Sequence, residues 1–584
     1  MKKSIFILVL LCATTAVWAQ RKQTHRKTAA KQQTQKKAPA KSTAKPAANK
    51  PAAKEAAPDD VTQSKTVTIT SSFKPSLRNA SKINFSAATP VNDLELPKLQ
   101  YRVPAQNLFF TYQPATLKPL ALNPDSALRW DNSSYVKLGF GNYTTPFAQV
   151  GLSFGDPSKA LVNVNADHIS SKGSLPFQEY RKTGASVSGI FTPNDNVEWN
   201  GTVFFRNTNQ YRYGFTPDTL KSYSKDSLKQ QYTNFGIKVG LRNKQENEYG
   251  IDYNPTIAAN AFSDNNHARE ASFVLDAPLS KSFSKVFAFN LGVRADITSY
   301  KRDSVAKNIS NNLFYVTPAL QFKTPDFKLV AGVTPSWDNG AFHLLPNFTA
   351  DARIVEERFV LQAGWVGSYN KNTYQSLSTT NPWLLQPTFL TNTRLGEEYA
   401  GFKGSAGAHF TYNARVSYLQ IRNQALFVND TLLGNSFNVV NENSMNDLRL
   451  HAEIGYTVQE KFSLLGGFSY NQYTNLKDNQ KAWGLLPLEI NGSLRWQVVK
   501  DFTFKSDVFF WDGPRYYNKS FGAGKQDPAV DLNLGAEFTV LPRLNIWLQV
   551  NNLFNNKYER WHQYQVLGTN VLGGVVYSFG QTAK

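Results

Sequence analysis

The sequence predicts an all-β chain that forms a transmembrane antiparallel β-barrel of about 20 strands, in an even number between about 18 and 22. The 584 residues include 26 Tyr and 40 Phe, and the mean hydropathy is -0.41. That mixture suits a sheet that is apolar on one face and wet on the other. Alternating runs recur from residue 134 onward, about one per 20 residues. After residue 19 no run approaches the ~18 apolar residues of a spanning helix, so strands must make any membrane crossing.

Residues 1–19 have the features of a secretory signal peptide. Two lysines precede an apolar run over residues 5–17, and a small-residue cleavage site ends at Ala19. The single cysteine, Cys12, lies inside this segment. A lipid anchor there is the alternative, but Leu11 precedes the cysteine where a small residue is usual. If Cys12 is lost with the signal, the mature chain has no thiol, which excludes disulfides, zinc-thiolate sites and cysteine nucleophiles.

Residues 20–60 form a Lys- and Ala-rich linker that is predicted to be disordered. The net charge of the chain is +21, and residues 21–57 alone hold eleven Lys and Arg against one acid, Glu55. With almost no large apolar side chain, this stretch cannot bury enough surface to offset the entropy of ordering. A secreted chain meets no genome, so we expect no nucleic-acid partner. A solvated spacer and an electrostatic tether to an anionic partner remain as alternatives.

Residues 61–133 are predicted to run extended and to form no domain of their own. Six prolines between residues 90 and 124 disfavour a helix or a central strand. The aromatic residues in 108–112 need a surface to pack against, and the lumen of the barrel or a partner protein could supply it.

The barrel itself is predicted over residues 134–584. Two alternating runs at 135–141 and 147–154, joined by a short turn, predict the first hairpin. Further strands are predicted at 161–168, 183–191, 197–205, 232–241, 249–257, 271–279, 286–297, 313–322, 327–335, 342–352, 358–369, 406–421, 448–458, 462–473, 488–498, 502–510, 531–540 and 543–552, with a final strand that ends at residue 579.

The run at 448–458 illustrates the alternation. Leucines 448 and 450 share one face with Ile454, while Arg449, His451 and Glu453 share the other. The apolar face would point inward in a soluble sandwich and toward lipid in a membrane barrel. The signal peptide and the large number of strands favour the membrane barrel.

The predicted connections differ in length. Short connections are expected at 142–146, 192–196, 459–461, 499–501 and 541–543, and long ones at 207–231, 370–395, 422–447, 474–486 and 511–528. Outer-membrane barrels place short turns on the periplasmic side and long loops outside, so we assign these two groups to the two sides accordingly.

The last fifty residues carry a resemblance to a known family. The segment 550–558, VNNLFNNKY, followed by a terminal strand with Gly574, Tyr577 and Phe579, resembles the C-terminal barrel of TonB-dependent receptors. Residues 72–84 and 135–145 resemble a Bacteroidetes-type subgroup of such receptor-like barrels. The resemblance implies an outer-membrane location, and it implies that the terminal Gly574, Tyr577 and Phe579 are the signal that barrel-assembly machinery recognises.

The chain departs from the family before the barrel. A complete receptor carries a plug domain of well over a hundred residues there, whereas only about sixty residues separate Thr70 from Ser134. We therefore expect that the plug is missing. Residues 65–70 look a little like a TonB box, and the alternative is a plain extended segment.

No motif predicts an enzyme, a cofactor or a metal site. The seven histidines show no paired spacing, and His451 on its lumen face is expected to belong to a hydrated charge lining. Aromatic and cationic loop residues could instead contact a ligand or lipid, or form an interfacial aromatic girdle. These residues are Trp383, Arg515, Tyr516, Tyr517, Lys519 and Trp561.

Two classes of function remain open. In the first, the chain is a structural or accessory subunit of an envelope assembly, secretion or transport complex, with periplasmic or membrane partner proteins. In the second, it is a passive outer-membrane channel or a TonB-linked transporter for a small solute. An open lumen of about twenty strands would leak, so something must fill it, and residues 61–133 are the candidate. This favours the first class.

Overall fold

The computed structural model describes residues 133–580, apart from 157–158, 215–221, 246, 304–306, 357, 432–433, 460 and 519–521. The predicted signal peptide, linker, extended segment and TonB box lie outside the described residues. Lys519 lies outside them as well.

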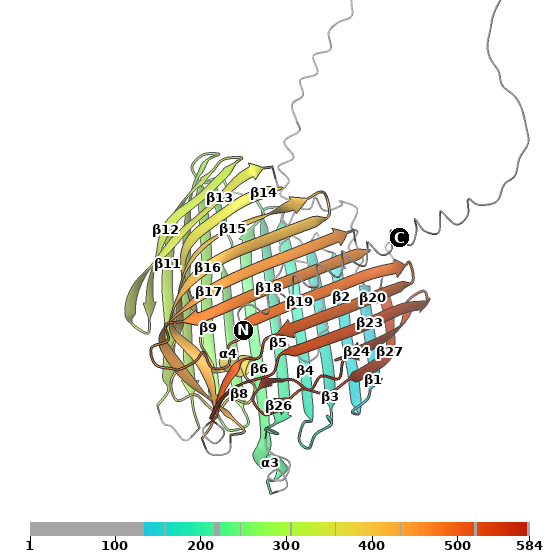
Figure 1. The fold of residues 1–584 in the computed structure, drawn as a ribbon. Coiled ribbons are helices and arrows are strands. Elements are labelled where there is room, and N and C mark those ends of the chain that lie inside the picture. Colours follow the sequence, from blue (N-terminus) through green and yellow to red (C-terminus); the bar gives the residue numbers. More distant parts are fainter. Residues whose placement is uncertain are drawn as a thin grey trace, which may run out of the picture. The chain divides into compact units, whose positions relative to one another are not determined.

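The described chain forms a closed antiparallel barrel of 22 strands (Figure 1). The first strand, β1 (Ser133–Gly141), pairs with β2 (Thr145–Asp156) on one side and with the last strand, β27 (Asn570–Gly580), on the other. The pairing of β1 with β27 runs from Ser133–Gly580 to Gly141–Leu572 and closes the sheet, so the barrel has no free edge. The predicted fold class is confirmed.

The remaining barrel strands follow one another around the ring, and most are longer than predicted. They are β3 (Ala160–Ser171), β4 (Tyr180–Asn194), β5 (Val197–Tyr211), β6 (Lys229–Asn243), β8 (Thr256–Asp264), β9 (Arg269–Ser282), β10 (Phe287–Lys301), β11 (Ile309–Lys323), β12 (Phe327–Asp338), β13 (Ala341–Val355), β14 (Phe359–Asn370), β15 (Thr393–Ala406), β16 (Phe410–Asn429), β17 (Phe437–Val458), β18 (Phe462–Thr474), β19 (Leu488–Val499), β20 (Phe502–Trp511), β23 (Ala529–Leu541) and β24 (Leu544–Asn551). The short strand β7 (Ile251–Tyr253) precedes β8 and pairs with the same neighbour, β9, within the barrel sheet. Short elements outside that sheet are α3 (Lys225–Leu228), α4 (Tyr374–Thr380), and the hairpins β21 (Arg515–Asn518) with β22 (Gly522–Lys525) and β25 (Glu559–Trp561) with β26 (Tyr564–Gln565). No helix among the described residues is long and apolar enough to cross a membrane.

The apolar faces of the strands point outward. On β17, Leu448 and Ile454 are 41% and 47% exposed, while the side chains of Arg449 and Glu453 face the lumen. There Arg449 pairs with Asp447 at 3.1 Å and Glu453 contacts His451 at 3.2 Å. Large apolar side chains are exposed in the same way on strands all around the ring. A continuous apolar outer surface of this size is typical of a lipid-facing barrel, and it decides between the two orientations that the alternation at 448–458 left open.

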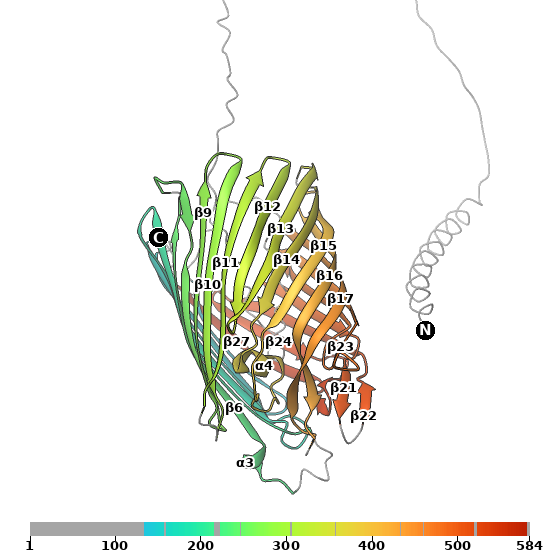
Figure 2. The same cartoon turned by 90° about the vertical axis from the view of Figure 1, so that its left-hand side faces the viewer.

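The two ends of the barrel differ. We call the end where β1 begins and β27 finishes the terminal end, and the opposite end, which carries the long connections, the loop end; Figure 2 shows α3, α4 and the β21–β22 hairpin at the loop end. The turn at 142–144 was predicted among the short periplasmic turns, but it lies at the loop end, where the Asn142 amide donates to the carbonyl of Thr569 at 2.8 Å. The prediction failed because turn length alone does not identify a side, since tight turns occur at both ends.

One strand was missed, and two neighbouring strands extend well into a segment that was predicted as a loop. Residues 393–406 form β15, which pairs along its length with β14 and β16, although 370–395 was predicted as a loop. Adjacent Glu397 and Glu398 and three glycines hide the alternation of this strand. Most of the predicted loop 422–447 extends β16 and β17 beyond their neighbours. The predicted strand 249–257 is instead divided between β7 and β8.

Candidate functional site: a folded cap at the loop end

The long connections at the loop end fold into one packed structure, which we call the cap. It is made of residues 371–392, 430–431, 434–436, 475–487, 512–518, 522–528 and 552–569, with α4 and the two short hairpins inside them. In both overall views α4 lies within the outline of the barrel (Figures 1 and 2). The cap therefore occupies space that an open barrel would leave to water.

The cap has an apolar, aromatic core that reaches across the lumen. The indole of Trp383 stacks on Tyr564 with ring centroids 3.8 Å apart, and Trp561 packs edge-on against Phe427 and Phe437 at 5.1 and 5.5 Å. The buried members of this core are Tyr232, Phe262, Ala268, Tyr300, Tyr374, Leu377, Leu384, Leu390, Ala425, Phe427, Phe437, Trp561 and Tyr564.

Residues 371–392 link two nearly opposite walls. Counted around the ring of 22 strands, β6 is the sixth strand and β17 the sixteenth. The ring of Tyr374 contacts Tyr232 of β6, with centroids 6.2 Å apart, and the backbone of Leu385 donates to the carbonyl of Phe437 at the start of β17 at 2.8 Å. One connection thus spans the mouth of the barrel.

The β8–β9 wall holds the start of α4 with two carboxylates. Glu270 Oε2 accepts from the backbone N–H of Tyr374 at 2.6 Å, and its Oε1 accepts from that of Gln375 at 3.1 Å. The Tyr374 hydroxyl donates to Asp264 at 2.7 Å. The side chain of Thr373 caps the same helix turn by accepting from Ser376 N. Free N–H groups at a helix start favour an anionic partner, so Glu270 fixes this turn to the wall.

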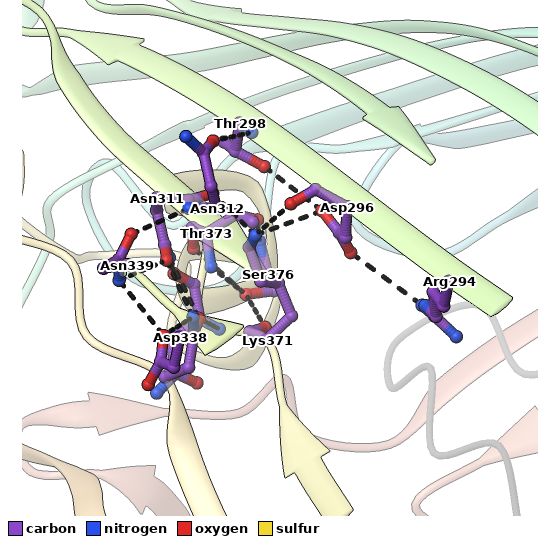
Figure 3. A network of polar contacts seen from close by, with 12 residues as sticks. Arg294, Asp296, Thr298, Asn311, Asn312, Asp338, Asn339, Lys371, Thr373 and Ser376 are labelled. Carbon is purple, nitrogen blue, oxygen red and sulfur yellow. Dashed lines mark hydrogen bonds and ion pairs between the residues drawn. The ribbon is translucent and has the colours of Figure 1, made fainter. Parts of the chain in front are cut away.

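The β10–β12 wall holds the same connection through a buried polar network (Figure 3). Lys371 Nζ lies 3.1 Å from Asp296 Oδ1 and donates to the backbone carbonyl of Asn311 at 2.6 Å. The amide of Asn392 exchanges hydrogen bonds with Asn311 at 2.7 and 2.9 Å, and it donates to Asp338 at 2.7 Å. Burial lowers the pKa of Lys371 and the Asp296 carboxylate opposes that shift, so the ammonium depends on its partner.

The connection 475–487 is anchored by a single carboxylate. Glu442, at the loop end of β17, is fully buried and accepts from the backbone N–H groups of Lys477, Asp478 and Asn479 at 2.7, 3.1 and 2.8 Å. A buried carboxylate is tolerated only when it is well hydrogen-bonded, which Glu442 achieves through three consecutive backbone donors.

The lumen wall below the cap is polar and charge-paired. Cations and acids of neighbouring strands face each other in the pairs Arg242–Glu198 (2.8 Å), Arg415–Glu397 (3.6 Å) and Lys505–Glu537 (3.6 Å). Lys403 of β15 reaches across β14 to Asp351 of β13 at 3.0 Å. His451 joins this lining by contacting Ser469 at 2.8 Å and Glu453 at 3.2 Å. No group of three or more metal-ligating His, Cys, Asp or Glu side chains occurs among the described residues.

The structure separates the predicted loop contacts into two groups. Trp383 and Trp561 belong to the core of the cap, and Trp561 is only 5% exposed. On the β21–β22 hairpin, Tyr516 stacks in parallel on His562 at 3.7 Å, Tyr517 packs near Trp483 and is 40% exposed, and Arg515 is exposed. A ligand or lipid contact of these residues stays a prediction.

The anchors of the cap were not among the predicted site residues. Glu270, Lys371 and Glu442 are ordinary charged residues at strand ends, and nothing local marks them as buried. The one signal that could have predicted these anchors is their position: each is a charged residue close to a strand end, and its side chain is on the face of the strand that points into the lumen.

The proposed assembly residues lie on β27 near the terminal end. Tyr577 and Phe579 face outward at 49% and 37% exposure with ring centroids 6.1 Å apart, as expected for an aromatic pair at the membrane boundary. Gly574 lies against β1, where an added Cβ would come 1.9 Å from the carbonyl oxygen of Leu138. Their recognition by assembly machinery stays a prediction.

Comparison with solved structures identifies the fold. No protein-family model and no curated protein sequence matches this chain. The FrpB iron transporter from Neisseria meningitidis (F3-3 variant) matches with a TM-score of 0.59 and 12% identity over 77% of this chain and 82% of the transporter. The siderophore receptor PirA from Acinetobacter baumannii matches with a TM-score of 0.59 and 9% identity over 76% of this chain and 80% of the receptor. The barrel therefore has the fold of TonB-dependent outer-membrane transporters.

Proposed function

We propose that this chain is an outer-membrane barrel of the TonB-dependent-receptor type, of Bacteroidetes type and without a plug domain, that is closed by its own cap. In this proposal it serves as a structural or accessory subunit of an envelope assembly, secretion or transport complex and has no catalytic activity. The observation that carries the proposal is the cap core, which joins the β6 wall to the β17 wall across the lumen.

The physical argument concerns the cost of opening. A ring of 22 strands encloses a lumen wide enough to pass water and solutes unless something fills it. Opening this mouth would expose the rings of Tyr374 and Trp561 and would strip the buried carboxylate of Glu270 of its two backbone donors. A closure that is this extensively packed and hydrogen-bonded suits a permanent lid better than the mouth of a passive channel.

The alternative function is transport of a small solute. Two features favour it, namely the fold shared with iron and siderophore transporters and the polar, ion-paired wall beneath the cap. A wetted lumen would suit a solute that passes once the cap has moved aside.

Conductance in a planar bilayer tests the proposal. We expect the full-length protein to be silent, and a variant in which residues 374–386 are replaced by a short Gly-Ser linker to conduct. A variant that lacks residues 61–130 measures separately whether that segment also blocks the lumen. Large, stable conductance of the unmodified protein would refute the permanent lid and favour the channel.

A partner test completes the design. The accessory role predicts that a periplasmic or membrane protein co-purifies in mild detergent with the full-length chain. Uptake of a ferric siderophore by cells that carry the chain, lost on deletion of the gene, would favour the transporter instead.

A further inference from the structure

The junction of β1 and β27 is the place where the first and the last strand of the ring pair and close it. All other neighbouring strands of the ring follow one another along the chain, so the segment that connects them lowers the entropy cost of their pairing. At this closure seam the backbone pairing has no such support. Side chains that contact both sides of the seam can therefore supply stabilisation that the chain connection supplies elsewhere in the ring.

Four residues form one row across the seam on the inner face of the barrel. Register places Trp547 of β24 beside Gly574 of β27, Gly574 beside Gly139 of β1, and Gly139 beside Phe147 of β2. The two aromatic rings meet over the two glycines, with centroids 5.5 Å apart in an edge-to-face arrangement. We call these four residues the seam row.

The indole makes a direct connection to the first strand. Trp547 Nε1 donates to the backbone carbonyl of Leu138 at 3.2 Å and so reaches from β24 past β27 to β1. Lys137, also on β1, places its ammonium 4.2 Å from the centre of the indole. Trp547 is 3% exposed, so both contacts are made in a site shielded from water.

The glycines are a geometric requirement of this arrangement. A Cβ on Gly139 would lie 2.3 Å from Cζ2 of Trp547, and a Cβ on Gly574 would lie 1.9 Å from the Leu138 carbonyl oxygen. Any other residue at either position would push the indole off the seam or the two strands apart.

A second bridge lies on the same seam at the loop end. The Asn570 amide of β27 donates to the Asn142 side chain at 2.7 Å, and the Asn551 amide of β24 donates to Asn570 at 3.3 Å. The Asn142 amide in turn donates to the carbonyl of Thr569. Two separate sets of side-chain contacts, the seam row and these asparagines, thus connect β24, β27 and β1.

We propose that the seam row is a lock that holds the barrel closed, and that the lock forms only after β27 has paired with β1. Because Trp547 contacts Leu138 and Phe147 across β27, these contacts exist only in the closed ring. Removing the lock leaves every hairpin intact and weakens the seam alone. The proposal does not depend on whether the barrel transports a solute.

The test compares the opening rates of purified full-length barrels. The rate at which the folded band is lost in hot SDS, or at which the protein unfolds in urea, measures opening. We expect Trp547→Ala to open at least about tenfold faster than the unmodified protein, because it loses an aromatic pair and a buried hydrogen bond. Trp547→Phe, which keeps a ring but loses the N–H donor, should fall between the two.

A matched control separates the seam from ordinary wall packing. Tyr399 of β15 lies over a glycine in the same manner, with a Cβ on Gly364 falling 2.5 Å from its ring, and Arg415 sits 4.8 Å from the ring centre. Both of its neighbouring strands are joined to β15 through chain connections. Tyr399→Ala therefore removes an aromatic contact of the same kind away from the seam.

A reversible crosslink makes the outcome decisive. Leu138 and Val575 are register partners across the seam and both face outward, so Leu138→Cys with Val575→Cys can form a disulfide there. Oxidation should abolish the difference between the Trp547 variants and the unmodified protein, and should leave the effect of Tyr399→Ala in place. The proposal is overturned if oxidation fails to rescue the Trp547 variants or rescues Tyr399→Ala equally. If Trp547→Ala does not assemble, Trp547→Phe decides, and a Phe variant that opens at the unmodified rate overturns the lock.

Discussion

Replacing Lys371 with methionine should release the cap from the β10–β12 wall. Lys371 is 12% exposed and Asp296 is 6% exposed, and their charged atoms lie 3.1 Å apart. Removing one partner of a buried pair costs about 3–5 kcal/mol, because the other charge stays buried without compensation. Arg294 lies 3.8 Å from Asp296 and can take over part of the pairing, so we expect about 3 kcal/mol. That energy corresponds to a roughly 100-fold larger population of the released cap.

Two further variants show whether the effect comes from the Asp296 carboxylate that is left buried without a partner. Asp296→Asn in the Lys371→Met background removes that charge and should recover part of the loss. Lys403→Met breaks an ion pair with Asp351 that is about a third exposed, so it should change the cap population by less than about fivefold. Hydrogen exchange of the backbone amides in 371–392 and the frequency of brief openings in a planar bilayer measure the population. Equal behaviour of Lys371→Met and Lys403→Met, or a double variant worse than Lys371→Met, would refute the reasoning.

Three further outcomes are expected. Glu270→Gln should weaken the charge-assisted hydrogen bonds to the start of α4 by about 1–2 kcal/mol, seen as faster hydrogen exchange at Tyr374, while a rate unchanged from the parent would contradict that anchor. His562 lies in the 552–569 connection, outside the spanning strands, and burial lowers its pKa to about 4. Because the folded cap favours the neutral ring, this contribution to stability is fully present above about pH 6.5 and is lost as the pH falls toward 4. It amounts to at most about 3 kcal/mol. Tryptophan fluorescence should report this loosening, and His562→Gln should remove its pH dependence. Phe579→Asp places a charge on the lipid-facing end of β27 and should block membrane assembly, so normal folding and surface exposure of this variant would argue against the assembly signal.

The outward faces of the strands could be predicted from short stretches of sequence. In 448–458 apolar residues alternate without interruption with polar, charged or small ones, and the side chains of a strand point to opposite faces by geometry. The same rule failed for β15, because glycines and two adjacent glutamates erase the contrast between the faces although the backbone pairs normally.

The candidate site could not be predicted in the same way. Lys371 meets Asp296 across 75 residues of sequence, and Tyr374 meets Glu270 across 104. Whether a lumen-side carboxylate is buried under a folded connection depends on which strands are neighbours and on how far their ends project. Neither property appears in the residues on either side of it.

By itself the sequence determined which residues of a strand share a face, because alternation within a strand is a local property of the backbone. The predicted signal peptide and the large number of strands then favoured a membrane barrel over a soluble sandwich. The tertiary structure alone decided the closure of the ring, the cap and the seam row. Trp547, Gly574, Gly139 and Phe147 align only through the register of four strands drawn from the two ends of the chain. Register is set by pairing between distant segments, so it emerges only when the whole sheet has closed.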